Sequence, residues 1–287
     1  MRLVSFLRNG LASFGCVEGD AVLDFGATAP ANATLRDYLP LGLPVWKALA
    51  GAVGSRDRVP LSQVTLLAPV PNARKFLALG GNYAAHAAEA ARAGIVRTNA
   101  QVWFNKQITC INGPYAPIER PRVSTQLDYE GELGVVIARS CRHVTSDAAW
   151  SVVAGYVVCN DVSVRDWQLR APTHMLGKSF DTHGPFGPWI VTADEIPNPH
   201  ALMLETFVNG ELRQRASTAD MIHHVPAMLE ELTTAFTLQP GDILSTGTPA
   251  GVGGLLDPPR YLVPGDVVRV EIEGIGYIEN RVVEERS

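Results

Sequence analysis

The chain has 287 residues, of which 46% are hydrophobic and 18% are charged, and its formal net charge is −5. This composition fits a globular protein with a substantial core, as one large domain or as a large and a small one. The acidic balance, with no run of lysine or arginine, argues against nucleic acid as the main partner. No apolar stretch reaches membrane-spanning length, so we expect no membrane partner.

Cysteine usage and the first residues predict a cytoplasmic protein. The four cysteines are scattered and form no Cys-x-x-Cys pair, as expected for reduced thiols. The opening sequence MRLVSFLRNG lacks a long apolar core followed by a small-residue cleavage site. We therefore expect no signal peptide.

Residues 1–68 predict a small α+β module without clustered chemistry. Two apolar strands flank Asn9-Gly10, which predicts a β-hairpin with a type I′ turn, and a third strand follows over Ala21–Phe25. Short helices are expected over Leu35–Leu39 and Val45–Ala52. The closely spaced Pro69 and Pro71 mark the boundary with a larger domain, residues 69–287.

An alanine-rich stretch, Tyr83–Ala93, predicts a helix that Gly94 ends. His86 and Glu89 are three residues apart, so their side chains are neighbours on one helix face. A carboxylate beside an imidazole orients it and favours its use as a general base acting on water. On these residues alone, a surface helix with an incidental His–Glu pair is the stronger interpretation.

The stretch Gln126–Gln168 carries three acids at the ends of buried strands. Glu130 and Glu132 are two apart, so in an extended chain they point to the same side of a sheet. A second apolar strand ends at Asp161. Buried carboxylates are costly unless they bind a cation, and an all-carboxylate set suits Mg²⁺, with Mn²⁺ or Ca²⁺ as alternatives. A solvated strand face with a helix-capping aspartate is an equally good interpretation of the spacing.

Several polar residues accompany these acids. A helix is expected over Ser163–Arg170, on which Arg165 and Gln168 would meet a substrate carboxylate or simply form a solvated face. Lys178 is a candidate catalytic ammonium beside the ion. Lys106, at the end of a short strand, is weaker evidence because most lysines are solvated.

The remaining chain predicts many strands and few long helices. The expected elements are a helix over Ser146–Val153, a hairpin turning at Asn209-Gly210, an amphipathic helix over Val225–Phe236, and strands over Val267–Glu273 and Tyr277–Val283. A Gly/Thr loop around Thr248 would allow a backbone to approach a ligand closely. The pattern favours an α+β fold with a mostly antiparallel or mixed sheet over a doubly wound one.

Seven stretches, in order, resemble the fumarylacetoacetate hydrolase family from Lys75 to Val283. They are GGNYAAHAAE, WFNKQITCINGP, DYEGELGVVI, GYVVCNDVSVRDWQ, GKSFDTHGPFGPWIV, VNGELRQ and PGDILSTGTPAGVG. The resemblance implies a mostly β, mixed β-sandwich roll that forms a homodimer. The chain departs mildly from the family pattern. Cys110 stands where serine is common, and Gly131 and Gly134 stand where alanine is common.

The resemblance also implies roles for individual residues. Glu130, Glu132 and Asp161 would bind a Mg²⁺-type ion, and His86 with Glu89 would activate water. Lys178 would stabilise developing negative charge. The expected substrate contacts are Arg165, Gln168, Thr248, Tyr83 and Lys106.

The leading functional hypothesis is metal-dependent hydrolysis of a C–C bond in a 2,4-dioxo acid, such as an acylpyruvate or fumarylpyruvate, to pyruvate and a carboxylic acid. The alternatives are decarboxylation of an oxaloacetate-like acid, isomerisation or hydration of a 2-hydroxy-dienedioate, and, more remotely, non-catalytic binding of a small molecule. Loops around Ile95–Gln101 and Tyr115 are expected to select the acyl group.

Overall fold

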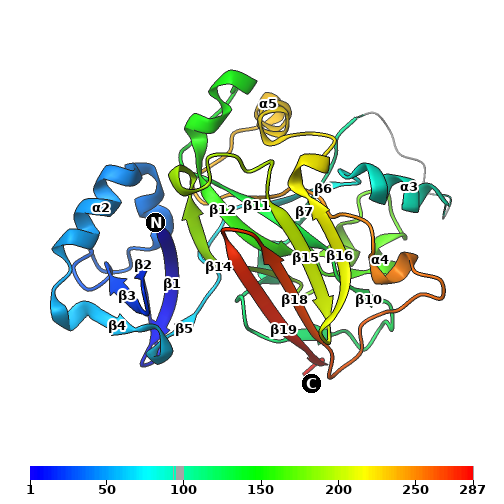
Figure 1. The fold of residues 1–287 in the computed structure, drawn as a ribbon, viewed down its shortest axis with the longest axis horizontal. Helices are drawn as coiled ribbons and strands as arrows, with labels where there is room; N and C mark the ends of the chain where they lie inside the picture. The colour runs from blue at the N-terminus through cyan, green and yellow to red at the C-terminus, as the bar shows by residue number, and fades with distance from the viewer. Residues whose placement is uncertain (93, 95–99, 287) are drawn as a thin grey trace.

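The computed structural model describes residues 1–92, 94 and 100–286, and it consists mainly of strands (Figure 1). Within these residues the largest sheet has twelve strands. Ten of them follow the order β4 (Arg58–Pro60), β3 (Ala21–Asp24), β2 (Leu11–Glu18), β1 (Arg2–Arg8), β14 (Gly184–Thr192), β12 (Val153–Asn160), β11 (Gly131–Ile137), β17 (Ile243–Ser245), β6 (Phe76–Gly80) and β7 (Val102–Lys106). The short strands β5 (Thr65–Leu66) and β8 (Ile111–Asn112) pair with β1 and β14.

A second sheet and a short ribbon complete the β-structure of the described residues. The five-stranded sheet has the order β16 (Glu211–Ser217), β15 (Met203–Val208), β18 (Val267–Ile272), β19 (Gly276–Glu284) and β9 (Ile118–Arg120). The ribbon pairs β10 (Leu127–Asp128) with β13 (Ser163–Val164). Because β17–β6, β14–β8 and β19–β9 are parallel and the other pairs are antiparallel, the prediction of a mixed sheet assembly is confirmed.

The helices are short and lie at the edges of the sheets. They are α1 (Leu35–Tyr38), α2 (Gly42–Ala52), α3 (Ala84–Arg92), α4 (Arg165–Gln168) and α5 (Val225–Ala235). In Figure 1, α1 and α2 belong to the N-terminal part at the left, and α3 lies on the opposite side of the molecule. None of the described helices is long and apolar enough to cross a membrane.

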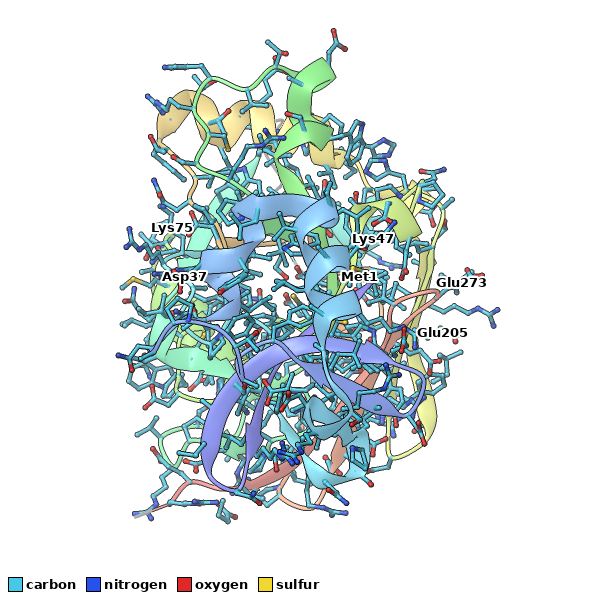
Figure 2. All side chains as sticks on the ribbon, turned by 90° about the vertical axis from the view of Figure 1, so that its left-hand side faces the viewer. Met1, Asp37, Lys47, Lys75, Glu205 and Glu273 are labelled. Carbon is cyan, nitrogen blue, oxygen red and sulfur yellow. The ribbon has the colours of Figure 1, made fainter. Side chains whose placement is uncertain are left out.

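The N-terminal part continues the central sheet. Asn9 and Gly10 both have positive φ angles, 52° and 78°, which confirms the predicted type I′ hairpin. The hairpin strand β1 pairs with β14, so the N-terminal strands extend the sheet that contains β11 and β12. Figure 2 views this part from the front, with Met1 and Lys47 labelled on it. The boundary at residue 68 remains a prediction.

Strands β11 and β12 form the centre of the molecule because both of their faces are covered. Every residue of both strands is buried, as expected from their β-branched composition. Alternate side chains enter different clusters: Leu133 and Val135 pack in the larger core, whereas Val136 and Val157 pack in the core shared with the N-terminal part. Residues at the ends of β11 and β12 are therefore held in fixed positions by the surrounding core.

Two predicted helices differ in the structure. Residues Ser163 and Val164 pair with β10 as a strand, and only Arg165–Gln168 are helical, because Ser163 Oγ bonds back to the Asp161 carbonyl and the pairing keeps the chain extended. The segment Ser146–Val152 is a 3₁₀ helix. The amphipathic helix α5 is confirmed. The predicted helix end at Ala93 lies outside the described residues.

Candidate active site and metal centre

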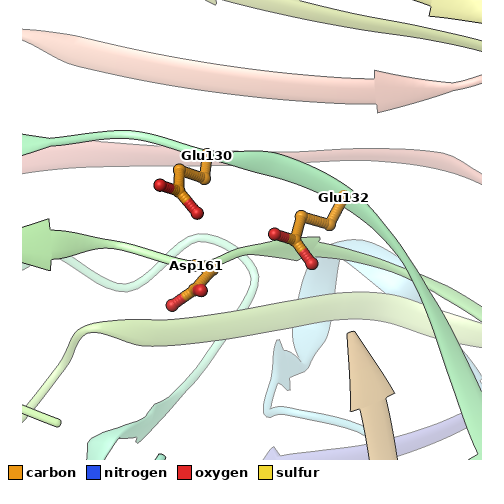
Figure 3. A group of neighbouring side chains, drawn as sticks. All are labelled: Glu130, Glu132 and Asp161. Carbon is orange, nitrogen blue, oxygen red and sulfur yellow. The ribbon is translucent and has the colours of Figure 1, made fainter. Parts of the chain in front are cut away.

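Three carboxylates meet where β11 begins and β12 ends (Figure 3). Register pairs Gly131 with Asn160, and the Asp161 N–H donates to the Glu130 carbonyl at 2.9 Å, so the acids from two strands are brought together. One oxygen from each of Glu130, Glu132 and Asp161 lies within 4.8 Å of the others. The structure thus assembles the three acids expected to bind a metal, all of them buried.

Cationic side chains surround two of the three acids. Lys178 Nζ lies 2.7 Å from Glu130 Oε2 and 2.8 Å from Asp161 Oδ2. Arg165 Nη1 lies 2.6 Å from Glu130 Oε1, and Lys106 Nζ lies 2.6 Å from Asp161 Oδ1. Glu132 instead accepts a backbone hydrogen bond from Gly247 at 2.8 Å, and among the described residues no cation pairs with it.

Because their partners differ, the pKa values of Glu130 and Glu132 shift in opposite directions. Burial opposes ionisation of Glu130, but the charges of Lys178 and Arg165 outweigh it and hold the pKa of Glu130 well below its usual range. Burial, together with the charges of Asp161 and Glu130, raises the pKa of Glu132 well above its ordinary value. Lys178 lowers the pKa of Glu132 only partly, because in the described structure it pairs with Glu130 and Asp161 and not with Glu132.

The donor set fits a divalent cation. All three candidate donors are carboxylates, which hard divalent ions prefer, and a cation bound beside Glu132 would favour the ionised form that burial and the charges of Asp161 and Glu130 oppose. The preference for Mg²⁺ over Mn²⁺ or Ca²⁺ remains a prediction, because all three accept oxygen ligands.

Asp128 organises the residues around this centre, although sequence reasoning assigned it no role. It is fully buried and accepts hydrogen bonds from the N–H groups of Gly253 and Gly254, each at 2.8 Å, and from Arg165 Nε at 2.8 Å. It therefore joins Arg165 to the glycine loop. Its two-residue spacing from Glu130 was a usable signal, because alternate residues of an extended chain share a face.

The predicted His–Glu pair is present on α3. His86 Nδ1 lies 3.1 Å from Glu89 Oε2. Because a carboxylate only accepts, Nδ1 carries the shared proton, and Nε2 is left with a lone pair. The Gly251 N–H lies 3.3 Å from both Glu89 oxygens, which holds the carboxylate in place.

His86 and two of the clustered acids, Glu130 and Glu132, line one cavity of about 530 Å³. Its described wall includes Gly80, Gly81, Gln126, Tyr261 and these predicted site residues: His86, Glu130, Glu132, Arg165, Gln168, Lys178 and Thr248. Arg165 Nη1 also donates to Gln168 Oε1 at 2.9 Å, so these two expected substrate contacts are linked. The volume lies within the range of about 300–1,000 Å³ typical of small-molecule sites.

Other predicted contacts lie behind the wall. Lys106 is 1% exposed and donates to Asp161 and to the carbonyls of Val162 and Lys178, so all three of its protons are used within the protein. Tyr83 is likewise buried and does not line the cavity. As placed, both support the site and do not face a substrate.

Thr248 lines the cavity, but its hydroxyl group is already hydrogen-bonded within the protein. The Thr248 hydroxyl donates to the Gly131 carbonyl and accepts from Gln214, so it connects the Gly/Thr loop to the start of β11. Tyr115 packs on Tyr277 and does not line the cavity. Residues 95–99 of the other expected loop lie outside the described residues.

Comparison with known proteins identifies the family. A family model described as fumarylacetoacetate (FAA) hydrolase, C-terminal, matches residues 75–283. The chain belongs to this family. The resemblance predicted from seven motifs is therefore confirmed, and so is the predicted family fold.

Relatives of this family member carry more than one activity in their names. Oxaloacetate tautomerase fahd2, mitochondrial, of Xenopus laevis is 36% identical over 99% of this chain and 90% of its own length. The structure of fumarylacetoacetate hydrolase from Exiguobacterium antarcticum is 38% identical, with a TM-score of 0.86, over 99% of this chain and 100% of that one. Maleylpyruvate hydrolase from Sphingobium sp. SYK-6, solved with manganese(II) and pyruvate, is 33% identical with a TM-score of 0.82, and both chains are covered fully.

Proposed function

We propose that this protein is a metal-dependent hydrolase that cleaves a C–C bond of a 2,4-dioxo acid to give pyruvate and a carboxylic acid. The observation that carries the proposal is one cavity lined by two acids of a carboxylate cluster and by an imidazole whose Nδ1 is held by a glutamate. A solved relative with pyruvate and manganese(II) bound supports the product and the class of ion.

The proposed roles follow from the hydrogen bonds. Glu130, Glu132 and Asp161 would hold a divalent cation, which supplies Lewis acidity toward the oxo acid. Nε2 of His86 takes a proton from water, and the water oxygen adds to the distal carbonyl. Glu89 keeps the ring oriented and stabilises its protonated form.

Bond cleavage then requires stabilisation of negative charge. The C3–C4 bond breaks, its electron pair stays on the pyruvate fragment as an enolate, and a proton returned to C3 completes pyruvate. Lys178 and Arg165 line the cavity and supply fixed positive charge for this step. Water contributes the hydroxyl group of the released carboxylic acid, so the reaction needs no other reactant.

The test is a Mg²⁺- or Mn²⁺-dependent assay of pyruvate release from acetylpyruvate and fumarylpyruvate. His86→Ala is expected to lower kcat by about 10²–10⁴-fold, the usual contribution of a general base. A His86→Ala enzyme that cleaves acylpyruvates at the wild-type rate would refute the proposal. Unchanged metal affinity in this variant would show that the carboxylate cluster is intact.

A second candidate function is keto–enol interconversion of oxaloacetate. The 36% identity to an oxaloacetate tautomerase over nearly the whole chain favours it. Such a reaction moves a proton at C3 and needs no attacking water, so the same imidazole would serve as the proton carrier. Metal-dependent loss of the oxaloacetate enol absorbance, without pyruvate release from any acylpyruvate, would select this candidate. Carbon dioxide release from oxaloacetate would instead indicate decarboxylation.

Two further proposals concern quaternary structure and cellular location. The first comes from the family resemblance, and the second from the cysteines and the first residues. We expect a homodimer, which light scattering after size-exclusion chromatography would test. The cytoplasmic location remains a prediction, since the Xenopus relative is named as mitochondrial.

A further inference from the structure

The cavity wall carries apolar as well as charged side chains. We call the part lined by Ala87, Ala90, Val102, Leu169 and Leu255 its apolar end; Phe104 also lines the cavity, and the centroid of its ring lies 5.2 Å from Lys178 Nζ. A pyruvate group bound at the carboxylates would leave the rest of the substrate facing these side chains. A cavity of about 530 Å³ is larger than an acid of four or five carbons fills.

The helix α3 creates the space at this end. Ala87 and Ala90 are one turn apart and line the cavity, whereas Ala84, Ala85 and Ala88 of the same helix are exposed. Because alanine ends at its β-carbon, the space in front of the helix stays open. A larger side chain at position 90 would therefore project into it.

The described cavity offers no unpaired full cation to a second carboxylate. Arg165 is bonded to Asp128 and Glu130, and Lys178 is bonded to Glu130 and Asp161. The Nη2 atom of Arg165 has no partner among the described residues, but it is buried. The remaining basic groups of the described wall are imidazoles. His86 is held by Glu89, and His174 packs edge-on against Phe104, with Nδ1 3.2 Å from the Gln168 carbonyl.

We propose that the apolar end selects an uncharged acyl group of aromatic or branched aliphatic size, and that a second carboxylate on that group is disfavoured. The reaction in which the group takes part rests on the proposed function, but its binding does not. The substrate class would be aroylpyruvates and long-chain acylpyruvates, as distinct from dioxo diacids.

Binding of 2-oxo acids that are not cleaved tests this directly. Calorimetry would be run with the full-length protein and Mn²⁺, using 2-oxopentanoate, 4-phenyl-2-oxobutanoate and 2-oxoadipate. The phenyl compound is expected to bind at least about tenfold more tightly than 2-oxopentanoate, because it buries more apolar surface. Tightest binding of 2-oxoadipate would overturn the proposal, since it would reveal a cation available to the second carboxylate.

A matched pair of variants locates the effect. Ala90→Leu is expected to weaken binding of the phenyl compound by at least about tenfold while leaving 2-oxopentanoate within about threefold. Ala88→Leu makes the same change on the exposed face of α3 and should alter neither. Equal phenyl affinity in Ala90→Leu and Ala88→Leu would overturn the assignment of the pocket.

The two proposals can fail separately. If the phenyl compound binds tightest but no acylpyruvate is hydrolysed, the selectivity proposal stands and the hydrolase proposal fails. If acetylpyruvate is hydrolysed and 4-phenyl-2-oxobutanoate binds no better than 2-oxopentanoate, the hydrolase proposal stands and the selectivity proposal fails.

Discussion

The two sides of the cavity are built differently. The carboxylate wall, formed by Glu130 and Glu132 next to Asp161, comes from strands buried on both faces, and its acids are held by several partners. The helix wall, formed by His86, Ala87 and Ala90 of α3 next to Glu89, comes from a nine-residue helix with no fully buried residue. The acids proposed to bind the cation thus lie in the core, whereas the proposed base, His86, lies on a lightly packed helix.

The difference predicts separate consequences for mutation. Changes in the carboxylate wall should alter stability as well as activity, because their partners are buried. Changes in the helix wall should alter activity while leaving the free energy of unfolding nearly unchanged. The following variants test whether the two walls respond differently to mutation.

The largest effect is expected for Glu132→Gln. Loss of one ligand charge should lower kcat/KM by about 10³-fold or more and abolish tight Mn²⁺ binding in calorimetry. The metal-free variant should be at least as stable as the wild type, because glutamine replaces a buried carboxyl group whose ionisation is opposed by burial and by two neighbouring acids. Glu231→Gln, on the exposed side of α5, is the matched control. Retained metal affinity in Glu132→Gln would remove this residue from the ligand set.

Lys106→Met should lower the free energy of unfolding by about 3–5 kcal/mol, because it leaves Asp161 without one of its buried partners. Urea unfolding would measure the change. The exposed Lys47→Met should stay within about 0.5 kcal/mol of wild type. A Lys106→Met protein as stable as Lys47→Met would contradict the support role assigned to this lysine.

Glu89→Gln tests the helix wall. Loss of the carboxylate that orients His86 should lower kcat by roughly tenfold to a hundredfold, with the thermal midpoint unchanged. Kinetics and calorimetry on the same preparation would show both. A large fall in the thermal midpoint would mean that α3 is part of the stability core, and the contrast between the two walls would be lost.

The effect that is smallest at neutral pH, and that develops only in acid, concerns His183. This residue is fully buried near Lys106 and donates through Nε2 to the Glu119 carbonyl. Burial lowers the pKa of His183 to about 3, so the folded protein keeps it neutral while the unfolded chain takes up a proton near pH 6.5. Stability should therefore fall by about 1.4 kcal/mol per pH unit as the pH drops from 6.5 toward 3. His183→Gln should show a shallower fall in acid unfolding. Parallel curves for the two proteins would refute this account.

The neighbouring side chains of the site were predictable because their spacing signals are local, although those signals alone left an incidental His–Glu pair and a solvated strand face as equally good or better interpretations. The family resemblance decided between them. The i, i+3 spacing of His86 and Glu89 and the i, i+2 spacing of Glu130 and Glu132 define shared faces before any tertiary contact is known. The type I′ hairpin at Asn9-Gly10 is equally local, since both residues need positive φ angles.

The remaining features depend on contacts between distant segments. Whether Lys106 faces a substrate or an internal acid depends on Asp161, which lies 55 residues further along the chain. Ser163 was expected in a helix because its pairing with β10 is invisible to helical periodicity. The link between β1 and β14 could not be predicted either, because strand partners in a mixed sheet are not set by sequence proximity.

Gly131 lies between Glu130 and Glu132 and is closely packed. A β-carbon there would lie 2.2 Å from Thr206 Oγ1 and 2.9 Å from Val270 Cγ1 of the neighbouring sheet, so alanine, which is common at this position in the family, would require these two side chains to shift. Ala87 and Ala90 face open space and meet no such barrier. Substrate range can therefore diverge through α3 by single substitutions, whereas a larger residue between Glu130 and Glu132 requires a matching change in the second sheet.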